Sequence, residues 1–262
     1  MPRAASERRR LRETFEQVPE LYDRARPSYP EELFDDLAAL AGLRQGARIL
    51  EIGCGTGKAT LSLARRGFEI VCVELGEGLA AVARRNLAPF SNVEIVNVPF
   101  ERWETDSRFD AVVAFTAFHW IEPEAAYAQS ARLLRDGGAL AVVATRHVLP
   151  ADSDSFWAEV QEDYDAVVPS DENGPPPPLD EVPDLSDEIA ASGCFRNVAA
   201  RRYLWDALYT AGGYIALLDT YSGHRSMPDE QRKRLYARIR ARIGRGSVRK
   251  TYLFLLNVAV RL

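Results

Sequence analysis

From residue 47 onward, short runs of apolar and β-branched residues alternate with stretches in which apolar residues recur at the spacing of an amphipathic helix. The expected strands are 47–53 (ARILEIG), 69–75 (EIVCVEL), 93–99 (VEIVNVP), 109–117 (FDAVVAFTA) and 138–146 (GALAVVATR). The expected crossover helices are 58–66, 77–87 and 124–134, with Gly67 and Gly137 in stop positions. This alternation predicts an α/β fold with a doubly wound parallel sheet, covered by helices on both faces.

The chain changes character after Leu149. Two predicted helices, at 156–168 and 185–192, flank four consecutive prolines at 175–178, which fit neither a helix nor a central strand. We interpret 150–195 as an insertion over one edge of the sheet, with the prolines in a stiff extended loop. Two further strands are expected at 197–206 and 251–262, separated by helices near 211–221 and 228–242.

Composition and charge exclude several classes of protein. The chain has 262 residues, 47% of them hydrophobic and 27% charged, which is typical of a globular domain and excludes a disordered chain. Its 33 basic and 38 acidic residues give a net charge of −5, so we expect neither nucleic acid nor a membrane surface as a partner. The longest stretch without a charged residue, 207–218, is too short to span a bilayer.

The cysteines and the start of the chain indicate a reducing compartment. Cys54, Cys72 and Cys194 are odd in number and irregularly spaced, which does not suggest a disulfide framework. The basic residues at 8–12 are not followed by the apolar core of a signal peptide. We therefore predict a cytoplasmic protein.

The strongest motif is ILEIGCGTG, in which Glu51, Gly53, Gly55 and Gly57 alternate where the first strand meets the first helix. Glycines at such a junction let the backbone bend and approach a ligand, and the helix N-terminus faces that ligand. The dinucleotide pattern G-x-G-x-x-G is not met from either possible start, and the phosphate-binding G-x-x-x-x-G-K-[ST] pattern is also absent. A nucleotide-like ligand fits, whereas an ordinary glycine-rich turn would leave Glu51 unexplained.

The next strand ends carry side chains suited to the rest of a nucleoside. Glu74, about 20 residues beyond the loop, can accept both hydroxyls of a ribose, although a surface glutamate at a helix start is the alternative. Phe100 and Glu101 suit a purine ring and its amine, although Phe100 could also be a core residue. These side chains meet at the carboxyl edge of the sheet, where open α/β sheets bind ligands.

The sequence resembles the class I S-adenosylmethionine-dependent methyltransferases, whose first motif is this acidic residue followed by three alternate glycines. The phrases YDRARPSYP (22–30), FERW (100–103), AFHWI (117–121) and YTAGGYIALLDTYSGHR (209–225) are similar to bacterial small-molecule methyltransferases of the trans-aconitate-methyltransferase-like group. The resemblance covers roughly residues 15–262. It implies S-adenosylmethionine as cofactor and a Rossmann-like seven-stranded sheet whose last strand is antiparallel, with helical lid insertions.

The resemblance also implies positions for the cofactor. The residues implied to bind it are Glu51, Gly53, Cys54, Gly55 and Gly57 in the glycine motif, Glu74 and Leu75, Phe100 and Glu101, Thr116, and Tyr22 with Arg26 in the N-terminal phrase. Within this set, Glu74 would hold the ribose hydroxyls, and an arginine such as Arg26 could pair with the carboxylate of the cofactor. Thr116 departs from the pattern, because related sequences often carry an amide there.

The expected organisation has four parts. Residues 1–45 would form an N-terminal helical cap or lid, 46–149 the cofactor-binding core and 150–195 a lid insertion. Residues 196–262 would supply the last strands of the sheet and helices on the substrate side.

The expected activity is methyl transfer to a small-molecule acceptor, through an oxygen, nitrogen or carbon nucleophile, a carboxylate included. Such an in-line displacement depends mostly on positioning, and a base is needed only for an acceptor that must lose a proton. The candidate catalytic residues are His119, Tyr22 and His224, and His147 is a further candidate base, although a packing role is open for each histidine. The three histidines lack metal-ligand spacing, so we predict no metal.

Two other functions are compatible with this fold and have to be compared with the predicted one. Enzymes that methylate exocyclic amines of nucleic acids carry an Asp/Asn/Ser-Pro-Pro-aromatic phrase at the fourth strand end, where this chain has Thr-Ala-Phe-His at 116–119. A protein of the same fold that binds S-adenosylmethionine without transferring methyl, such as a cyclase or a regulator, stays open. The identity of the acceptor and the oligomeric state do not follow from the sequence.

Overall fold

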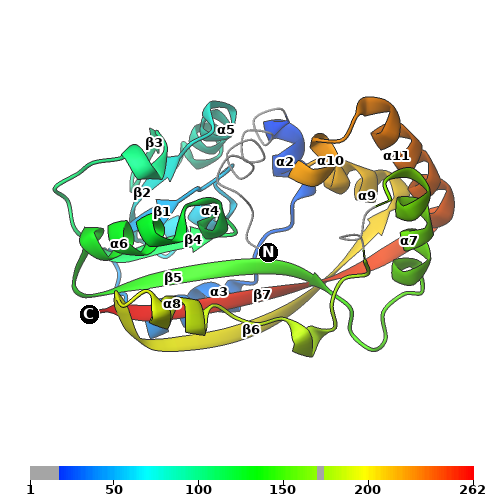
Figure 1. Ribbon diagram of the computed structural model, residues 1–262. Coiled ribbons are helices and arrows are strands. Elements are labelled where there is room, and N and C mark those ends of the chain that lie inside the picture. The colour runs from blue at the N-terminus through cyan, green and yellow to red at the C-terminus, as the bar shows by residue number, and fades with distance from the viewer. Residues whose placement is uncertain (1–17, 170–173) are drawn as a thin grey trace.

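The computed structural model describes residues 18–169 and 174–262, and these form one mixed sheet with helices on both faces (Figure 1). The strands are β1 (Arg48–Ile52), β2 (Glu69–Glu74), β3 (Val93–Asn97), β4 (Phe109–Phe115), β5 (Leu134–Val148), β6 (Phe195–Thr210) and β7 (Ser247–Arg261). Their order in the sheet is β3-β2-β1-β4-β5-β7-β6. The first five are parallel and β7 is antiparallel to both neighbours, which confirms the expected seven-stranded sheet.

The helices fall close to their expected positions. They are α2 (Pro19–Ala25), α3 (Glu31–Leu40), α4 (Lys58–Arg65), α5 (Glu77–Leu87), α6 (Pro123–Leu133), α7 (Phe156–Val167), α8 (Ser186–Ala191), α9 (Ala211–Leu218), α10 (Ser222–Arg225) and α11 (Asp229–Ile243), with short 3-10 turns η2 (Phe100–Arg102), η3 (Phe118–Trp120) and η4 (Leu179–Glu181). Within the described residues, no helix is long and apolar enough to cross a membrane.

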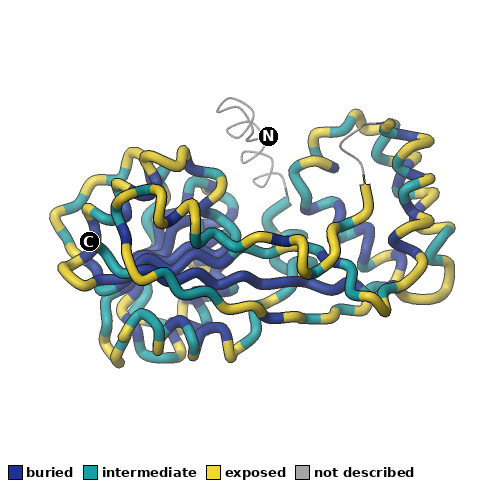
Figure 2. Tube along the Cα trace, turned by 60° about the horizontal axis from the view of Figure 1, so that its bottom comes forward, coloured by how far each residue is buried: buried dark blue, intermediate teal, exposed yellow. Residues whose placement is uncertain are grey.

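Two apolar clusters, one on each face, hold the sheet between its helices. Ile49 packs into the cluster that includes Leu33 of α3 and Leu63 of α4. Leu50, its neighbour in β1, packs into the opposite cluster with Tyr127 of α6 and Ile189 of α8. Successive strand residues point to opposite faces, so a continuous apolar run is what a strand buried on both faces requires. Figure 2 shows the central strands buried along most of their length.

The last three strands run well beyond the others and form a long ribbon that carries α7, α9, α10 and α11 at its far end (Figure 1). We call these four helices the helical lobe. The expected strands 197–206 and 251–262 were too short, because Ala207 pairs with Lys250 and Thr210 with Ser247. Charged residues at this end of β7 interrupt the apolar run, and only cross-strand pairing reveals that the strand continues. Gly137, expected as a helix stop, lies inside the longer β5.

The segment 150–195 is divided between two places. Its first helix, α7, packs against α11 in the helical lobe, whereas α8 packs on β6 at the edge of the sheet. The prolines at 175–178 form no helix, and Leu149 pairs with them through its N–H, which donates to the Pro177 carbonyl at 3.0 Å. Residues 1–17 of the expected N-terminal cap, which include the basic residues at 8–12, lie outside the described residues.

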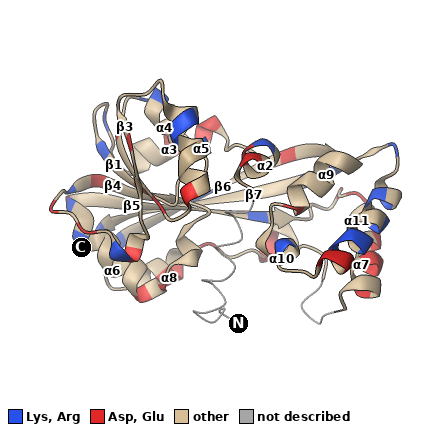
Figure 3. Cartoon of the chain, turned by 90° about the horizontal axis from the view of Figure 1, so that it is seen from above, with Lys and Arg blue, Asp and Glu red and all other residues tan. Residues whose placement is uncertain are grey.

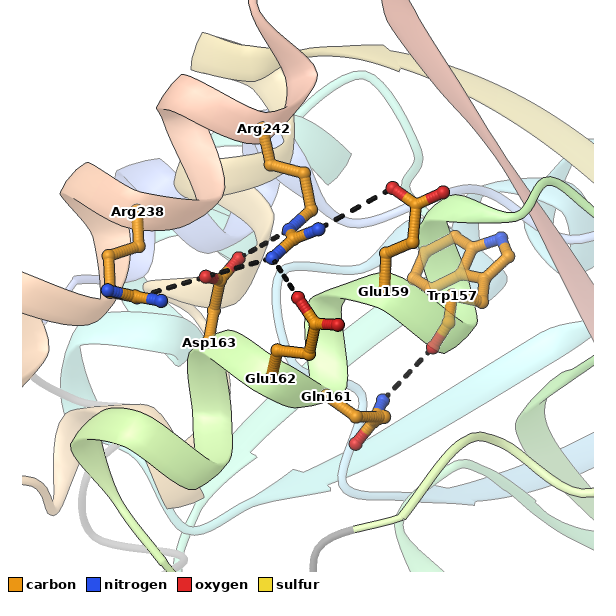
Figure 4. Close-up of polar contacts among 7 residues, drawn as sticks. All are labelled: Trp157, Glu159, Gln161, Glu162, Asp163, Arg238 and Arg242. Atoms are coloured by element: carbon orange, nitrogen blue, oxygen red, sulfur yellow. Dashed lines mark hydrogen bonds and ion pairs between the residues drawn. The ribbon is translucent and has the colours of Figure 1, made fainter.

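A charged network joins α7 to α11 (Figure 4). The Asp163 side chain is only 4% exposed, and its carboxylate accepts from Arg238 Nε at 2.9 Å and from Arg242 Nε at 2.7 Å. Arg242 also reaches Glu159 and Glu162, which are more exposed. These two arginines hold the pKa of Asp163 below its usual range. Figure 3 shows the acidic and basic residues along the two helices.

Candidate functional site

The glycine motif forms the turn between β1 and α4. Gly53 and Gly55 have φ angles of 68° and 57°, in the left-handed region that favours glycine. A Cβ at Gly53 would lie 2.7 Å from the Cβ of Ala117, so the close approach of the loop after β4 also requires glycine. The backbone of this turn is therefore open towards the carboxyl edge of the sheet.

Glu74, the last residue of β2, ties this turn to the start of α5. Its carboxylate oxygens accept from Gly55 N at 2.8 Å and from Gly76 N at 2.9 Å, and the residue is 6% exposed. The two backbone N–H groups thus fix the Glu74 carboxylate beside the glycine turn.

A cavity of about 620 Å³, which we call the glycine-loop cavity, opens at this edge of the sheet. Ten of the residues expected to bind cofactor or act in catalysis line it: Tyr22, Arg26, Gly53, Gly55, Glu74, Leu75, Phe100, Glu101, Thr116 and His119. Phe100 is 4% exposed and belongs to the core cluster while also lining the cavity, so its place in the core does not remove it from the cavity wall. The fold therefore brings together residues from five separate segments.

Glu51 and Cys54 lie in a smaller adjoining cavity of about 60 Å³, which also contacts Arg26 and Thr116. Glu51 is 1% exposed, and its Oε1 has no hydrogen-bond partner among the described residues. Burial raises the pKa of this carboxyl to about 7. A buried acceptor without a donor fits a positively charged group in the adjoining space, because such a group would favour the ionised form.

Gly57 is placed differently from the other two glycines. It has a φ of 86°, and a Cβ there would lie 2.7 Å from Leu87 Cδ1 of α5. Its small size therefore serves the packing of α4 against α5, and it lines neither of the two cavities.

Thr116 stands where the cavities meet. Its φ of 58° is unusual for a residue with a branched side chain. Its N–H donates to the Val143 carbonyl at 2.7 Å, and its hydroxyl bonds Thr145 Oγ1 at 2.8 Å and Tyr29 Oη at 3.2 Å. These contacts hold a strained backbone in place, which is common at ligand-binding sites.

Arg26 lies at the same junction and is held by its neighbours. It donates from Nε to Thr220 Oγ1 at 2.8 Å and from a terminal nitrogen to the Thr220 carbonyl at 2.9 Å. Its guanidinium lies 5.0 Å from the ring centre of Tyr22 and 4.3 Å from that of Tyr221. Arg26 therefore connects α2 to the segment after α9 and presents a positive charge to the cavities.

The three histidines are separated. His119 is exposed and lines the glycine-loop cavity, with its ring 4.8 Å from that of Trp120. His224 lies in the helical lobe, where its Nε2 is 3.0 Å from Tyr164 Oη, and burial together with Lys250 lowers its pKa to about 4. His147 is beside Trp157, and the structure brings it near His224 rather than near His119.

A further cavity of about 400 Å³, which we call the lobe cavity, lies between the ribbon and the helical lobe. It shares Arg26, Thr116 and Tyr221 with the glycine-loop cavity, so the two adjoin. Lys250 of β7 lines it, and the sequence analysis did not single this residue out. Lys250 precedes the strand expected at 251–262, so the local sequence pattern gave no signal of its burial.

The described residues contain no group of three His, Cys, Asp or Glu side chains arranged to hold a metal ion. The polar groups in the cavities are glycine N–H groups, carboxylates, arginines and a lysine. These groups are suited to an organic ligand with both charged and hydroxyl groups.

Comparisons with known proteins agree with this geometry. Residues 49–138 match the model of a family described as a methyltransferase domain. The chain is 37% identical over 126 residues to an uncharacterised methyltransferase of Mycobacterium tuberculosis, a match that covers 47% of this chain and 48% of that protein. It is 34% identical over 103 residues to a demethylmenaquinone methyltransferase of Clavibacter sepedonicus, covering 37% of this chain and 40% of the relative. This chain thus spans about half or less of the length of these relatives.

One solved structure covers almost the whole chain. It is a protein of Anaeromyxobacter dehalogenans provisionally assigned as a type II methyltransferase, with a TM-score of 0.61 and 24% identity, and it covers 90% of this chain and 97% of its own. At this identity the likeness shows a shared fold. The family match and the shared fold both cover the glycine turn and the strands around it.

Proposed function

We propose that the chain is a class I S-adenosylmethionine-dependent methyltransferase and that it transfers a methyl group from S-adenosylmethionine to a small-molecule acceptor, because residues 49–138 match a methyltransferase domain. The observation that carries the proposal is the glycine turn with the Glu74 carboxylate beside it, at the mouth of a cavity of about 620 Å³. A cavity of this size is large enough for a nucleoside cofactor. The narrower resemblance to the trans-aconitate group stays a prediction.

The residues of the glycine-loop cavity fit the cofactor by chemistry. Glu74 would accept from the ribose hydroxyls, with Leu75 beside it, and Phe100 with Glu101 would border the purine. Gly53 and Gly55 allow close approach to the turn. The unpartnered Oε1 of Glu51, next to Cys54, would accept from the ammonium group of the methionine part. Thr116, Tyr22 and Arg26 would cover the cofactor from the other side.

When bound, S-adenosylmethionine supplies an activated methyl group for an in-line displacement by the acceptor. The residues of this chain position and shield the reactants, and such positioning can account for much of the acceleration of a displacement. Arg26, Thr116 and Tyr221 form the shared wall of the two cavities and would exclude water. His119 lines the glycine-loop cavity and would be the candidate to take a proton from an acceptor that reaches it, and Tyr22, which lines the same cavity, is a second candidate.

His224 has a different role in the proposal. It lies in the lobe cavity, and its lowered pKa keeps it neutral at neutral pH. A neutral imidazole that is bonded to the Tyr164 hydroxyl can shape a binding site or accept a proton from an acceptor held in that cavity. We retain it as a candidate on the acceptor side.

The proposal includes the organisation expected from the sequence. Residues 46–149 would be the cofactor-binding core, covered by residues 1–45 and by the α7 part of 150–195 as lids, with 196–262 completing the sheet and the acceptor side. A cytoplasmic location is also part of the proposal, because Cys54, Cys72 and Cys194 are free thiols.

Calorimetric titration with S-adenosylmethionine, S-adenosylhomocysteine and NAD tests the cofactor. We expect the two sulfur compounds to bind and NAD not to bind. Replacing the Glu74 carboxylate with an amide (Glu74→Gln) should weaken S-adenosylhomocysteine by roughly 10- to 100-fold, because a charged acceptor is lost. Glu74→Ala is the more severe variant, and thermal unfolding verifies that both variants are folded.

Gln129→Ala serves as a matched control, since its amide bonds the backbone of η2 near the cavity without lining it. Its affinity for S-adenosylhomocysteine should stay close to that of the wild type. Absence of binding by both sulfur compounds, after removal of any copurified cofactor, would overturn the proposal. Binding without transfer of an isotopically labelled methyl group to any acceptor in a small-molecule library would instead favour a cofactor-binding protein that does not transfer methyl.

A further inference from the structure

Lys250 is a buried cation in the wall of the lobe cavity. The residue is 3% exposed. Within the described residues, its Nζ takes part in no hydrogen bond or ion pair. An ammonium group has three N–H donors, and burial without an acceptor costs several kcal/mol. A side chain held in this way is suited to an acceptor supplied by a ligand.

Four aromatic rings surround this ammonium and compensate only part of that cost. The distances from Nζ to the ring centres are 5.3 Å for Trp157, 5.4 Å for Tyr252, 5.9 Å for Tyr221 and 6.0 Å for Tyr214. Ring faces attract a cation, but they do not replace oxygen acceptors for its N–H groups. The rings therefore orient Lys250 while leaving its N–H donors available to the lobe cavity.

The charged residues that line the lobe cavity also favour an anionic ligand. Arg26 and Arg146 line it together with Lys250, and none of its described lining residues is an aspartate or a glutamate. His147 adds a buried Nε2 that has no partner in the described chain. Three cations without a carboxylate among these residues would be stabilised by an anion.

The remaining residues that line the lobe cavity indicate what kind of group would carry the negative charge of such an anion. Trp157, Tyr164, Tyr214 and Tyr252 present rings, and Val160 and Leu218 add aliphatic surface. At about 400 Å³ the cavity suits a small molecule. Flat, apolar groups pack well against such rings.

We propose that the lobe cavity is the acceptor site and that it selects a small carboxylate with a flat, apolar body, anchored by the ammonium of Lys250. Its role as the acceptor site rests on the proposed methyl transfer, because the lobe cavity adjoins the glycine-loop cavity at Arg26, Thr116 and Tyr221. The choice of a carboxylate rests on the groups of the lobe cavity alone.

The proposal has a pH signature. Burial and Arg26 lower the pKa of Lys250 to about 7, so Lys250 is largely uncharged in the free site above that pH, and a bound carboxylate would restore its proton. Binding at pH 8.5 should therefore take up close to one proton, and affinity should fall by up to tenfold per pH unit above 7.

The other titratable groups around Lys250 keep their charge state over this range. They are Arg26 after α2, Arg146 and His147 on β5, Tyr164 on α7, Tyr209 on β6, Tyr214 on α9, Tyr221 and His224 at α10, and Tyr252 on β7. Burial raises the pKa of all five tyrosines and lowers that of both histidines, so these groups are neutral from pH 6.5 to 8.5. The arginines stay charged.

The test is calorimetric titration of the full chain with benzoate and with benzamide, its uncharged counterpart of the same shape. The titrations are run at pH 6.5 and 8.5, in two buffers of different ionisation enthalpy, with and without S-adenosylhomocysteine. Benzoate should bind the wild type at least tenfold more tightly than benzamide at pH 6.5. Lys250→Met and Lys250→Gln should bind benzoate about 10- to 100-fold more weakly, leave benzamide unchanged and take up no proton.

Two control variants complete the design. Lys233→Met changes an exposed lysine that pairs with Glu230, and benzoate should bind it as it binds the wild type. The double variant Asp171→Asn with Glu172→Gln changes two carboxylates that lie outside the described residues and precede Gly174 in the sequence. Benzoate affinity should be unchanged there, and a marked rise would identify an internal carboxylate as the partner of Lys250 and overturn the proposal.

Equal binding of benzoate and benzamide, or full benzoate affinity in both Lys250 variants, would also overturn it. The titration with S-adenosylhomocysteine separates this result from a failure of the proposed function. If S-adenosylhomocysteine binds and benzoate does not, the carboxylate site is wrong and methyl transfer stands. If benzoate binds through Lys250 and S-adenosylhomocysteine does not bind, the acceptor role is overturned.

Discussion

At the scale of single residues, the molecule keeps several polar groups inside without the partners that stability alone would favour. Glu51 has a buried Oε1 without a hydrogen bond in the described chain, and Lys250 has a buried ammonium without a counter-ion there. Thr116 holds a left-handed backbone conformation with a φ of 58°. All three line cavities at one end of the sheet. Such a concentration of unfavourable features is typical of a binding site.

The cost of burying Lys250 should be measurable as a dependence of stability on pH. Its folded pKa of about 7 lies below the ordinary value of 10.5, so between these values the unfolded chain binds a proton that the folded chain does not. Wild-type stability therefore rises with pH in this window. Lys250→Met lacks this dependence. The free energy of unfolding of Lys250→Met minus that of the wild type should therefore be larger at pH 6 than at pH 9, by on the order of 2 kcal/mol.

Denaturant unfolding at the two pH values measures this difference. Lys233→Met, at an exposed lysine, should show no such change between pH 6 and pH 9. The same offset between Lys250→Met and the wild type at both pH values would contradict the lowered pKa.

Gly57 gives a second prediction at this scale. Gly57→Ala should lower the free energy of unfolding by about 1–3 kcal/mol, because φ is positive and the new Cβ would meet Leu87 Cδ1 at 2.7 Å. Gly212→Ala in α9 is the matched control, since nothing lies within 4 Å of its Cβ position and its φ is not positive. The control should be neutral or slightly stabilising in the same denaturant experiment, and equal losses in both variants would contradict the packing role.

At the scale of elements, the molecule consists of a short-stranded parallel half and a long ribbon that carries the helical lobe. The lobe helices α7 and α11 pack together at the far end of the ribbon, and the Asp163 network lies between them (Figure 4). The lobe cavity depends on this packing, because Trp157 and Tyr164 of α7 form part of its wall. The position of α7 therefore controls the shape of the proposed acceptor site.

Asp163→Asn should weaken the contact between α7 and α11. The lowered pKa of Asp163 means that its charge stabilises the fold above the unfolded value of about 3.9, and that this contribution is lost as pH falls through the folded pKa. We expect Asp163→Asn to lower the free energy of unfolding by about 1–3 kcal/mol at pH 7, because two arginines lose a largely buried partner. This difference from the wild type should become smaller below pH 4.

Unfolding of Asp163→Asn and the wild type from pH 7 to pH 3 checks this expectation. Glu162→Gln is the control on the same helix, and its effect at pH 7 should stay below about 1 kcal/mol because that carboxylate is 75% exposed. A difference for Asp163→Asn that persists unchanged at pH 3 would show that the charge is not responsible.

At the scale of the whole molecule, the site joins parts that are distant in the sequence. Arg26 bonds Thr220 and lines both the glycine-loop cavity and the lobe cavity. A cofactor bound there would contact the glycine turn, the segment after α2 and the segment before α10. Ligand binding should therefore stabilise the chain as a unit.

S-adenosylhomocysteine at 100 times its dissociation constant should add about 2.7 kcal/mol to the free energy of unfolding. For a chain of this size, that corresponds to a rise in Tm of about 5–10 °C. Thermal unfolding with and without the ligand measures the rise, and Glu74→Gln should show much less of it at the same concentration. An unchanged Tm in the wild type would disagree with a cofactor site between these segments.

The predictions from sequence were most accurate where chemistry and spacing are local. Gly53, Gly55 and Glu74 were expected at one edge of the sheet, and the structure joins Glu74 to the glycine turn by a hydrogen bond of 2.8 Å. Gly53 and Gly55 follow β1 and Glu74 ends β2, and these strands are parallel neighbours, so the pattern of the strands alone brings the three residues together. Gly57 belongs to the same motif, but its packing against Leu87 depends on where α5 lies.

The sequence by itself determined the parallel half of the sheet, its crossover helices and the edge at which a ligand would bind, because hydrophobic periodicity and glycine spacing are properties of short segments. Only the tertiary structure decided the length of the ribbon, the separation of His119 from His224, and the burial of Lys250 beside rings from four elements. Burial of a charge depends on what packs over it from distant parts of the chain, and no local pattern contains that information.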